Sequence, residues 1–111
     1  MTRALRFSIA AMGAAFCAIL AQPAMAKTAR CFTTDDGYYP CNFRGIDSAG
    51  SFTIWARGYP TLTIEVYRPG RAYGYADFGS GSRPLPGEYI RSRRDRACWD
   101  NTETGTQICA W

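Results

Sequence analysis

Hydrophobic and polar residues alternate along several short stretches of this chain. Over residues 61–67 the apolar side chains occupy every second position, and residues 52–56 repeat the pattern. A period of two is typical of strands with one buried face. Glycine and proline interrupt the chain every few residues, so no stretch except 88–97 is free enough to form a long helix. The pattern therefore predicts an all-β fold, with one face formed by Phe52, Ile54, Ala56, Leu62, Ile64 and Val66 turned toward the core.

The segment after residue 67 predicts a hairpin. Arg68-Pro69-Gly70-Arg71 has proline and glycine in the central positions of a type II turn. This turn joins strand 61–67 to a strand over 71–78. One face of the second strand is made mostly of small residues, which predicts close packing against a bulky neighbour. The members of that face are Ala72, Gly74, Ala76 and Phe78, and the expected neighbour is Trp55 or Trp99.

The other segments complete the fold class. Residues 79–87 have the composition of a loop, and we expect further short strands near 89–92, 96–100 and 106–110. About six to eight short strands, with turns between them, are typical of small antiparallel sandwiches and barrels. We therefore predict a single all-β domain over residues 27–111, either a small antiparallel β-sandwich or a partly open barrel.

The first 26 residues have the pattern of a secretory signal peptide. Two arginines precede an apolar run over 7–21, and Ala24-Met25-Ala26 places small residues at the −3 and −1 positions of a cleavage site. The run is shorter than the ~20 apolar residues that span a bilayer. We expect cleavage before Lys27, with Cys17 discarded and no transmembrane segment in the mature chain. The short, alanine-rich signal predicts a bacterial protein that is periplasmic or secreted.

Apart from Cys17 the chain has four cysteines, and an even number in an oxidising compartment predicts disulfides. Asp35-Asp36-Gly37 fits a three-residue hairpin loop with glycine in the left-handed position, which brings the first two cysteines opposite each other. A four-residue loop over 102–105 does the same for the last two. A zinc site with four cysteine ligands needs closer spacing within each pair. The turns therefore favour the disulfides Cys31–Cys41 and Cys98–Cys109.

Composition excludes several classes of function. The chain has no histidine, which removes the usual general base at neutral pH, histidine-activated nucleophiles and imidazole metal sites. Its formal net charge is +4, and part of that charge belongs to the signal. The rest is too small to predict a nucleic acid as partner. We therefore expect a protein that is not an enzyme and that has no metal or cofactor.

Aromatic residues and arginines supply the candidate binding residues. The alternation turns Trp55, Tyr67, Tyr73 and Tyr75 away from the aliphatic face. Exposed aromatic rows bind sugar rings and partner proteins, whereas in a two-layer fold such residues can instead form the other side of the core. Residues 91–96 are the densest charge cluster. This cluster is either an anion site or a solvated strand end, and strand alternation separates its four arginines into two pairs. We expect Trp55, Tyr73, Tyr75 and Arg93 to bind a ligand of unknown identity, with a cell-envelope glycan or an envelope protein as its class.

One loop resembles a motif of a known family. Ser80-Gly81-Ser82-Arg83 is similar to the Ser-Gly-x-(Arg/Lys)-Tyr loop that bacterial inhibitors of C-type lysozyme present on a small barrel, and Pro84 stands at the tyrosine position. The resemblance implies an alternative function, inhibition of a hydrolase through the 79–87 loop. Ser80 and Arg83 would then contact the catalytic carboxylates of that enzyme.

Overall fold

The computed structural model describes residues 26–111, so the predicted signal peptide, except for Ala26, lies outside the described residues. The described chain forms strands that all pair antiparallel. They are β1 (Lys27–Thr33), β2 (Gly37–Gly45), β3 (Phe52–Trp55), β4 (Thr61–Arg68), β5 (Arg71–Asp77), β6 (Ser82–Pro84), β7 (Tyr89–Arg91), β8 (Cys98–Asn101) and β9 (Gln107–Ala110). Within residues 26–111 no helix is long and apolar enough to cross a membrane.

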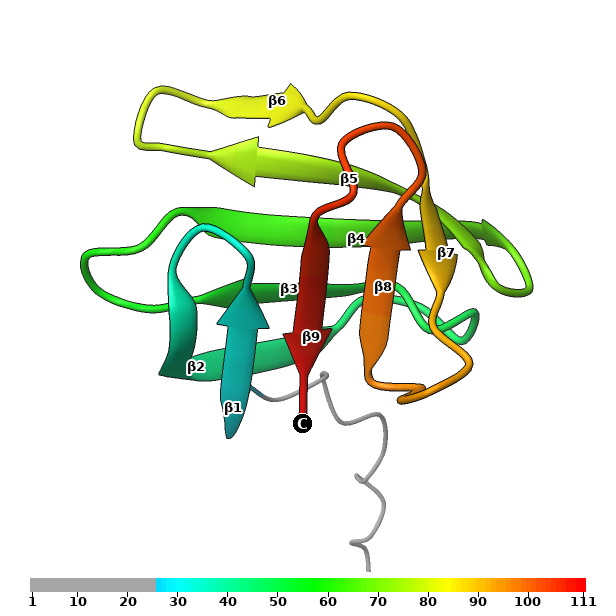
Figure 1. Cartoon of the computed structure of the whole chain (residues 1–111). Helices are drawn as coiled ribbons and strands as arrows, with labels where there is room; N and C mark the ends of the chain where they lie inside the picture. The colour runs from blue at the N-terminus through cyan, green and yellow to red at the C-terminus, as the bar shows by residue number, and fades with distance from the viewer. Residues whose placement is uncertain (1–25) are drawn as a thin grey trace, which may run out of the picture.

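Eight of these strands close into a barrel, and β6 lies outside it (Figure 1). The order around the barrel is β4-β3-β2-β1-β9-β8-β7-β5, and pairing of β4 with β5 closes the circle. Closure depends on β5, which pairs with β4 along one edge and with β7 and then β6 along the other. The all-β prediction is confirmed. Of the two predicted architectures the chain forms the barrel, and the barrel is closed.

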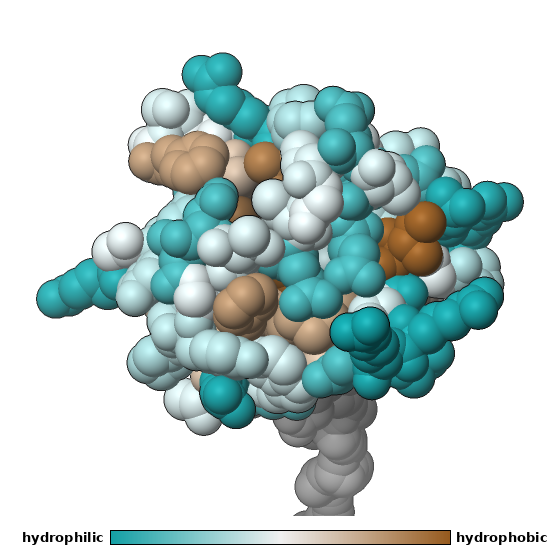
Figure 2. Space-filling model, in the orientation of Figure 1, coloured by the Kyte–Doolittle hydropathy of each residue, from teal (hydrophilic) through white to brown (hydrophobic). Residues whose placement is uncertain are grey.

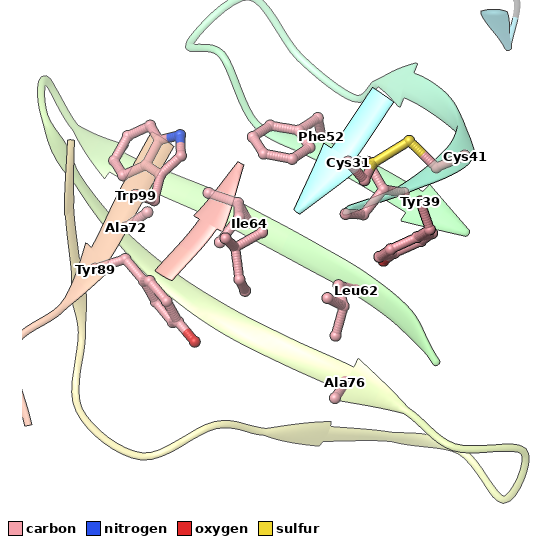
Figure 3. Packing of buried hydrophobic residues seen from close by; sticks show 12 residues of the cluster. Cys31, Tyr39, Cys41, Phe52, Leu62, Ile64, Ala72, Ala76, Tyr89 and Trp99 are labelled. Carbon is pink, nitrogen blue, oxygen red and sulfur yellow. A yellow bond between two sulfur atoms is a disulfide. The ribbon is translucent and has the colours of Figure 1, made fainter. Parts of the chain in front are cut away.

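The inward faces of the strands meet in one hydrophobic core (Figure 3). Phe52, Ile54, Leu62 and Ile64 are buried as the alternation predicts, and Val66 is partly buried against them. Trp99 of β8, 1% exposed, belongs to the same cluster. Phe78 departs from the prediction, because its side chain is 72% exposed. This residue follows the last residue of β5, so the strand pleat that would turn it inward has already ended.

The small residues Ala72 and Ala76 of β5 are buried, as predicted. The bulky neighbour of Gly74 between them is Tyr89 of β7, with Leu85 beside it. The expectation of Trp55 in this place was wrong, since Trp55 is half-buried at the end of β3, on the opposite side of the strand from the buried Phe52 and Ile54. Small side chains on β5 therefore make room for a ring that comes from the neighbouring strand.

Both predicted disulfides, Cys31–Cys41 and Cys98–Cys109, are present. In the second hairpin the predicted register is also confirmed, because Cys98 lies directly opposite Cys109. The loop of that hairpin ends on Gly105, whose φ of 71° lies in the left-handed region that favours glycine.

The predicted register of the first hairpin was wrong. Thr33 pairs with Gly37, and this places Cys31 opposite Tyr39 instead of Cys41. The cause is local: the Thr33 hydroxyl accepts a 3.0 Å hydrogen bond from the backbone N–H of Asp36, which starts the turn one residue early. The disulfide therefore runs diagonally across the strand pair, with 5.9 Å between the Cα atoms.

The segment predicted as a loop over 79–87 is partly a strand. β6 pairs with the last three residues of β5, and the two strands form a hairpin that extends from the barrel (Figure 1). The chain then returns to the barrel, where Asn101 holds it. The Asn101 side chain donates to the carbonyl of Pro86 and accepts from the backbone N–H groups of Glu103 and Thr104, each at 2.8 Å.

Because neighbouring strands are antiparallel, the connections lie at two ends of the barrel. The first, which we name the hairpin end, carries the connections 34–36, 56–60, 78–81 and 102–106. The second, the arginine end, carries 46–51, 69–70 and 92–97.

Candidate functional site

Tyrosines gather on the outer side of β4 and β5, where Glu65, Tyr67, Tyr73 and Tyr75 form what we name the tyrosine face. Glu65 lies directly opposite Tyr73 in the strand pair. The rings of Tyr67 and Tyr73 stack with their centroids 4.7 Å apart and their planes 19° apart. Tyr67 is 43% exposed and Tyr73 is 44% exposed. The result is an accessible aromatic surface with a carboxylate beside it.

Hydrogen bonds fix the orientation of these rings. The Tyr67 hydroxyl donates to Glu88 Oε1 at 2.7 Å, and Arg71 Nη1 donates to the same oxygen at 2.9 Å. Both bonds lower the pKa of Glu88. On the other side the Tyr75 hydroxyl donates to Glu65 at 3.3 Å, and the negative charge of Glu65 raises the pKa of Tyr75. The face is therefore held in shape before any ligand arrives.

An arrangement of this kind suits a sugar. An aromatic ring offers a flat apolar face to the C–H side of a pyranose, and a carboxylate accepts hydrogen bonds from hydroxyl groups. Tyr73 supplies the ring and Glu65 supplies the acceptor. Within the described chain, Glu65 accepts one side-chain hydrogen bond, from Tyr75, through Oε1, so its second oxygen can accept from a ligand.

The structure brings the predicted residues Tyr73 and Tyr75 together and places Trp55 apart from Tyr73. Trp55 is half-buried, and the guanidinium carbon of Arg44 lies 4.9 Å from its ring centroid. The neighbouring Ile54 is aligned through β4 with Ala76, at the far end of β5 from Tyr73. The rings of Trp55 and Tyr73 therefore do not form one row.

Arg93 lies at the arginine end, in a turn over residues 92–97 that sequence alternation did not predict. The Ser92 hydroxyl accepts from the backbone N–H groups of Arg94 and Asp95, and the turn brings the chain back to β8. Arg91 and Arg96 consequently line one cavity, whereas Arg93 and Arg94 do not. Arg91 is half-buried, and the other three arginines are exposed. The predicted division of the four arginines by strand alternation was wrong because this segment is not extended.

The β5–β6 hairpin carries the other two candidate residues. Ser80 and Arg83 are exposed, and the turn is fixed because Asp77 Oδ1 accepts from the backbone N–H groups of Gly79 and Gly81, at 2.7 Å and 3.2 Å. Hydrophobic surface lies over this hairpin at the upper left of Figure 2, where Phe78 is the exposed apolar residue. The hairpin thus presents a ring, a hydroxyl and a guanidinium to solvent.

Beside the hairpin, this end of the barrel opens into a cavity of about 330 Å³. Its volume lies at the lower end of the range of small-molecule sites. Sequence reasoning did not predict the cavity, because its walls come from segments far apart in the chain. The apolar part of the wall consists of Pro60, Leu62, Ala76, Phe78, Leu85, Pro86, Tyr89 and Ile108.

Sequence alternation placed Tyr67, Tyr73 and Tyr75 on the outward side but did not join Glu65 to them. The signal was available, because Glu65 lies on the same polar face of 61–67 as Tyr67 and the turn at Gly70 sets that strand beside β5. In the described part of the chain, no three Cys, Asp or Glu side chains gather closely enough to hold a metal ion. Comparison with family models, with curated proteins and with solved structures gives no match for this chain.

Proposed function

We propose that this protein is a small, non-enzymatic binding protein of the bacterial envelope, periplasmic or secreted, whose ligand is a glycan held on the tyrosine face. The observation that carries the proposal is the exposed ring of Tyr73 beside the carboxylate of Glu65. The bond from Tyr67 to Glu88 supports it, since a surface that is already ordered loses less conformational entropy on binding.

Two features support the compartment. The disulfides Cys31–Cys41 and Cys98–Cys109 are of a kind that persists in oxidising environments. Residues 1–26 have the pattern of a secretory signal. The modest net charge further favours recognition through individual contacts over attraction by a broad positive field.

The test is binding of the secreted, oxidised protein to purified peptidoglycan and other envelope glycans, measured by co-sedimentation and calorimetry. Replacing Tyr73 by alanine is expected to weaken binding about 10-fold or more, as loss of a central aromatic contact does. The matched control is Tyr38→Ala, which removes a ring that is 60% exposed on β2, away from the tyrosine face. Unchanged binding of Tyr73→Ala, or equal losses in both variants, would contradict the proposal.

A second candidate function is inhibition of a hydrolase by the β5–β6 hairpin, which the position of β6 outside the closed barrel favours. A hairpin in this place can enter an enzyme cleft without disturbing the core. Titration of a C-type lysozyme with the protein tests this function. Inhibition that Arg83→Ala relieves and Tyr73→Ala leaves unchanged would support it, and full lysozyme activity in excess protein would contradict it.

A further inference from the structure

The arginine end of the barrel contains a cavity of about 440 Å³ that the proposed function does not use. We name it the arginine pocket, because Arg68, Arg91 and Arg96 all line it. None of its lining residues in the described chain is an aspartate or a glutamate. Arg68 and Arg96 are exposed, and Arg91 is half-buried. A cation that is partly removed from water is normally paired with an acceptor of negative charge, so the environment of Arg91 requires an explanation.

Arg91 is the most enclosed of the three arginines. Its guanidinium carbon lies 4.9 Å from the ring centroid of Trp99, and its Nε atom is buried without a hydrogen-bond partner. Burial, and then the positive charge of Arg96, lower the pKa of Arg91. A buried donor without an acceptor, beside a like charge, is costly unless something negative occupies the space.

The carboxylates on neighbouring segments have other partners. Glu88 accepts hydrogen bonds from Tyr67 and Arg71. Asp95 accepts from the backbone N–H of Ala97 and from the indole Nε1–H of Trp111, both at 2.9 Å. Asp47, in the connection between β2 and β3, accepts from the backbone N–H groups of Ala49 and Ser51. These hydrogen bonds go to groups other than the three arginines of the pocket, although the charge of Arg68 also contributes to the lowered pKa of Glu88. Within residues 26–111, none of the three carboxylates is hydrogen-bonded to Arg91.

We propose that the arginine pocket binds an oxyanion group of the phosphate or sulfate class. A guanidinium that offers Nε and one Nη side by side donates to two oxygens of such a group, and the other arginines of the wall supply further charge-assisted bonds. The position of Arg91 is fixed by its strand, because its backbone N–H donates to the carbonyl of Gly70 at 3.0 Å. The pocket has room for an oxyanion that is free or esterified to a larger molecule.

The experiment measures binding of inorganic phosphate and of inorganic sulfate to the secreted protein, by calorimetry at low ionic strength. Replacing Arg91 by lysine, or Arg96 by alanine, is expected to weaken phosphate binding about 10-fold or more, because a lysine cannot form the two-pronged contact. Arg93→Ala and Arg94→Ala are the matched controls. They remove the same charge from the same turn but do not line the pocket, and we expect them to bind phosphate as the wild type does.

Equal weakening by Arg93→Ala and Arg96→Ala would overturn the proposal, because the effect would then come from net charge. Failure of the wild-type protein to bind millimolar phosphate or sulfate would overturn it as well. Arg96→Ala preserves the test if Arg91→Lys does not fold. These measurements are independent of Tyr73, so they succeed or fail separately from glycan binding on the tyrosine face.

One further comparison, which rests on the proposed function, distinguishes a free oxyanion from one carried by a glycan. Tyr67 belongs to the tyrosine face and also lines the arginine pocket, so one ligand can contact both. Glucose 6-phosphate is therefore compared with inorganic phosphate. Tighter binding of the ester, lost in Tyr73→Ala, identifies a phosphorylated glycan, and equal binding identifies the free ion. Both results support the oxyanion site.

Discussion

Tyr89 packs directly against the backbone of Gly74. A Cβ atom on Gly74 would overlap Cε2 of the Tyr89 ring and would lie 3.3 Å from Cδ1 of Leu85. Gly74 is in the middle of β5 and does not have a positive φ, so its role is to leave space and not to permit an unusual backbone conformation. The ring of Tyr89, 2% exposed, fills the barrel where β5 changes partner from β7 to β6.

Gly74→Ala is therefore expected to lower the free energy of unfolding by about 2 kcal/mol, as overpacking of a filled core does. The measurement is urea denaturation followed by tryptophan fluorescence. The control is Gly45→Ala, where an added Cβ meets no atom within 4 Å and the change should stay within about 0.5 kcal/mol. Similar losses at both positions would show that steric overlap with Tyr89 is not the cause.

Asn101→Ala is expected to cost about 2–3 kcal/mol, because it leaves the Pro86 carbonyl and two backbone N–H groups without their partner. Asn101 is 5% exposed, so water cannot replace the side chain easily. Asn42→Ala removes an asparagine whose side chain donates to the Trp55 carbonyl at 3.3 Å, and its smaller loss serves as the reference. Thermal unfolding of both variants checks this, and equal shifts would argue against a clamp at Asn101.

Replacing either cysteine pair by two alanines is expected to lower stability by roughly 3 kcal/mol, since each bridge closes a short loop in the unfolded chain. The two pairs have nearly equal sequence separations, 10 and 11 residues, so the two losses should be similar. Urea denaturation of the two double variants against the oxidised wild type measures both. A loss below about 1 kcal/mol in either would show that the loop argument fails for that hairpin.

Acid is expected to destabilise the protein partly through Glu88. Tyr67 and Arg71 hold the pKa of Glu88 below its ordinary value, so the folded protein binds this proton less tightly than the unfolded chain does. The resulting stabilisation is complete above the pKa of the unfolded chain, about 4.3, and is lost as the pH falls through the folded pKa. Asp47 and Asp95 shift in the same direction.

Glu88→Gln should consequently reduce stability at pH 7 and make the decline between about pH 5 and pH 3 shallower. Denaturant unfolding across this range is the measurement, with Glu103→Gln in the exposed turn between β8 and β9 as control. If the stability of Glu88→Gln fell with pH in parallel with that of the wild type, Glu88 would not contribute to the acid sensitivity.

Local patterns in the sequence were sufficient for much of the fold. Alternation over 52–56 and 61–67 reports a buried face because side chains on a strand point to opposite sides. Gly70 and Gly105 mark turns correctly, since both adopt a φ in the left-handed region, 75° and 71°. The Cys98–Cys109 disulfide follows from the register of the Gly105 hairpin. The Cys31–Cys41 pair was predicted correctly although the register of its hairpin was not. The same alternation identified Tyr73 and Tyr75 as residues that point away from the core.

Features that depend on distant segments could not be predicted in this way. Closure of the barrel requires β4 and β7 to share β5, and β6 forms because β7 leaves part of that edge free. The arginine pocket depends on the turn at Ser92, whose hydroxyl binds backbone groups of the following residues and returns Arg96 toward Arg91. Barrel closure forms only once the chain is folded, and the turn at Ser92 is set by local side-chain bonds, so strand periodicity records neither.

The pairing of β1 with β9 separates two events in folding, disulfide formation and closure of the barrel. Thr33 pairs with Ile108, so the barrel cannot close until nearly the whole chain has been synthesised. Each disulfide instead lies within one hairpin. Cys31–Cys41 can form while the C-terminal strands are still absent, whereas Cys98–Cys109 needs β9. Oxidation of the first pair can therefore precede closure. An assay of free thiols follows the first event, whereas fluorescence of the buried Trp99 follows the second.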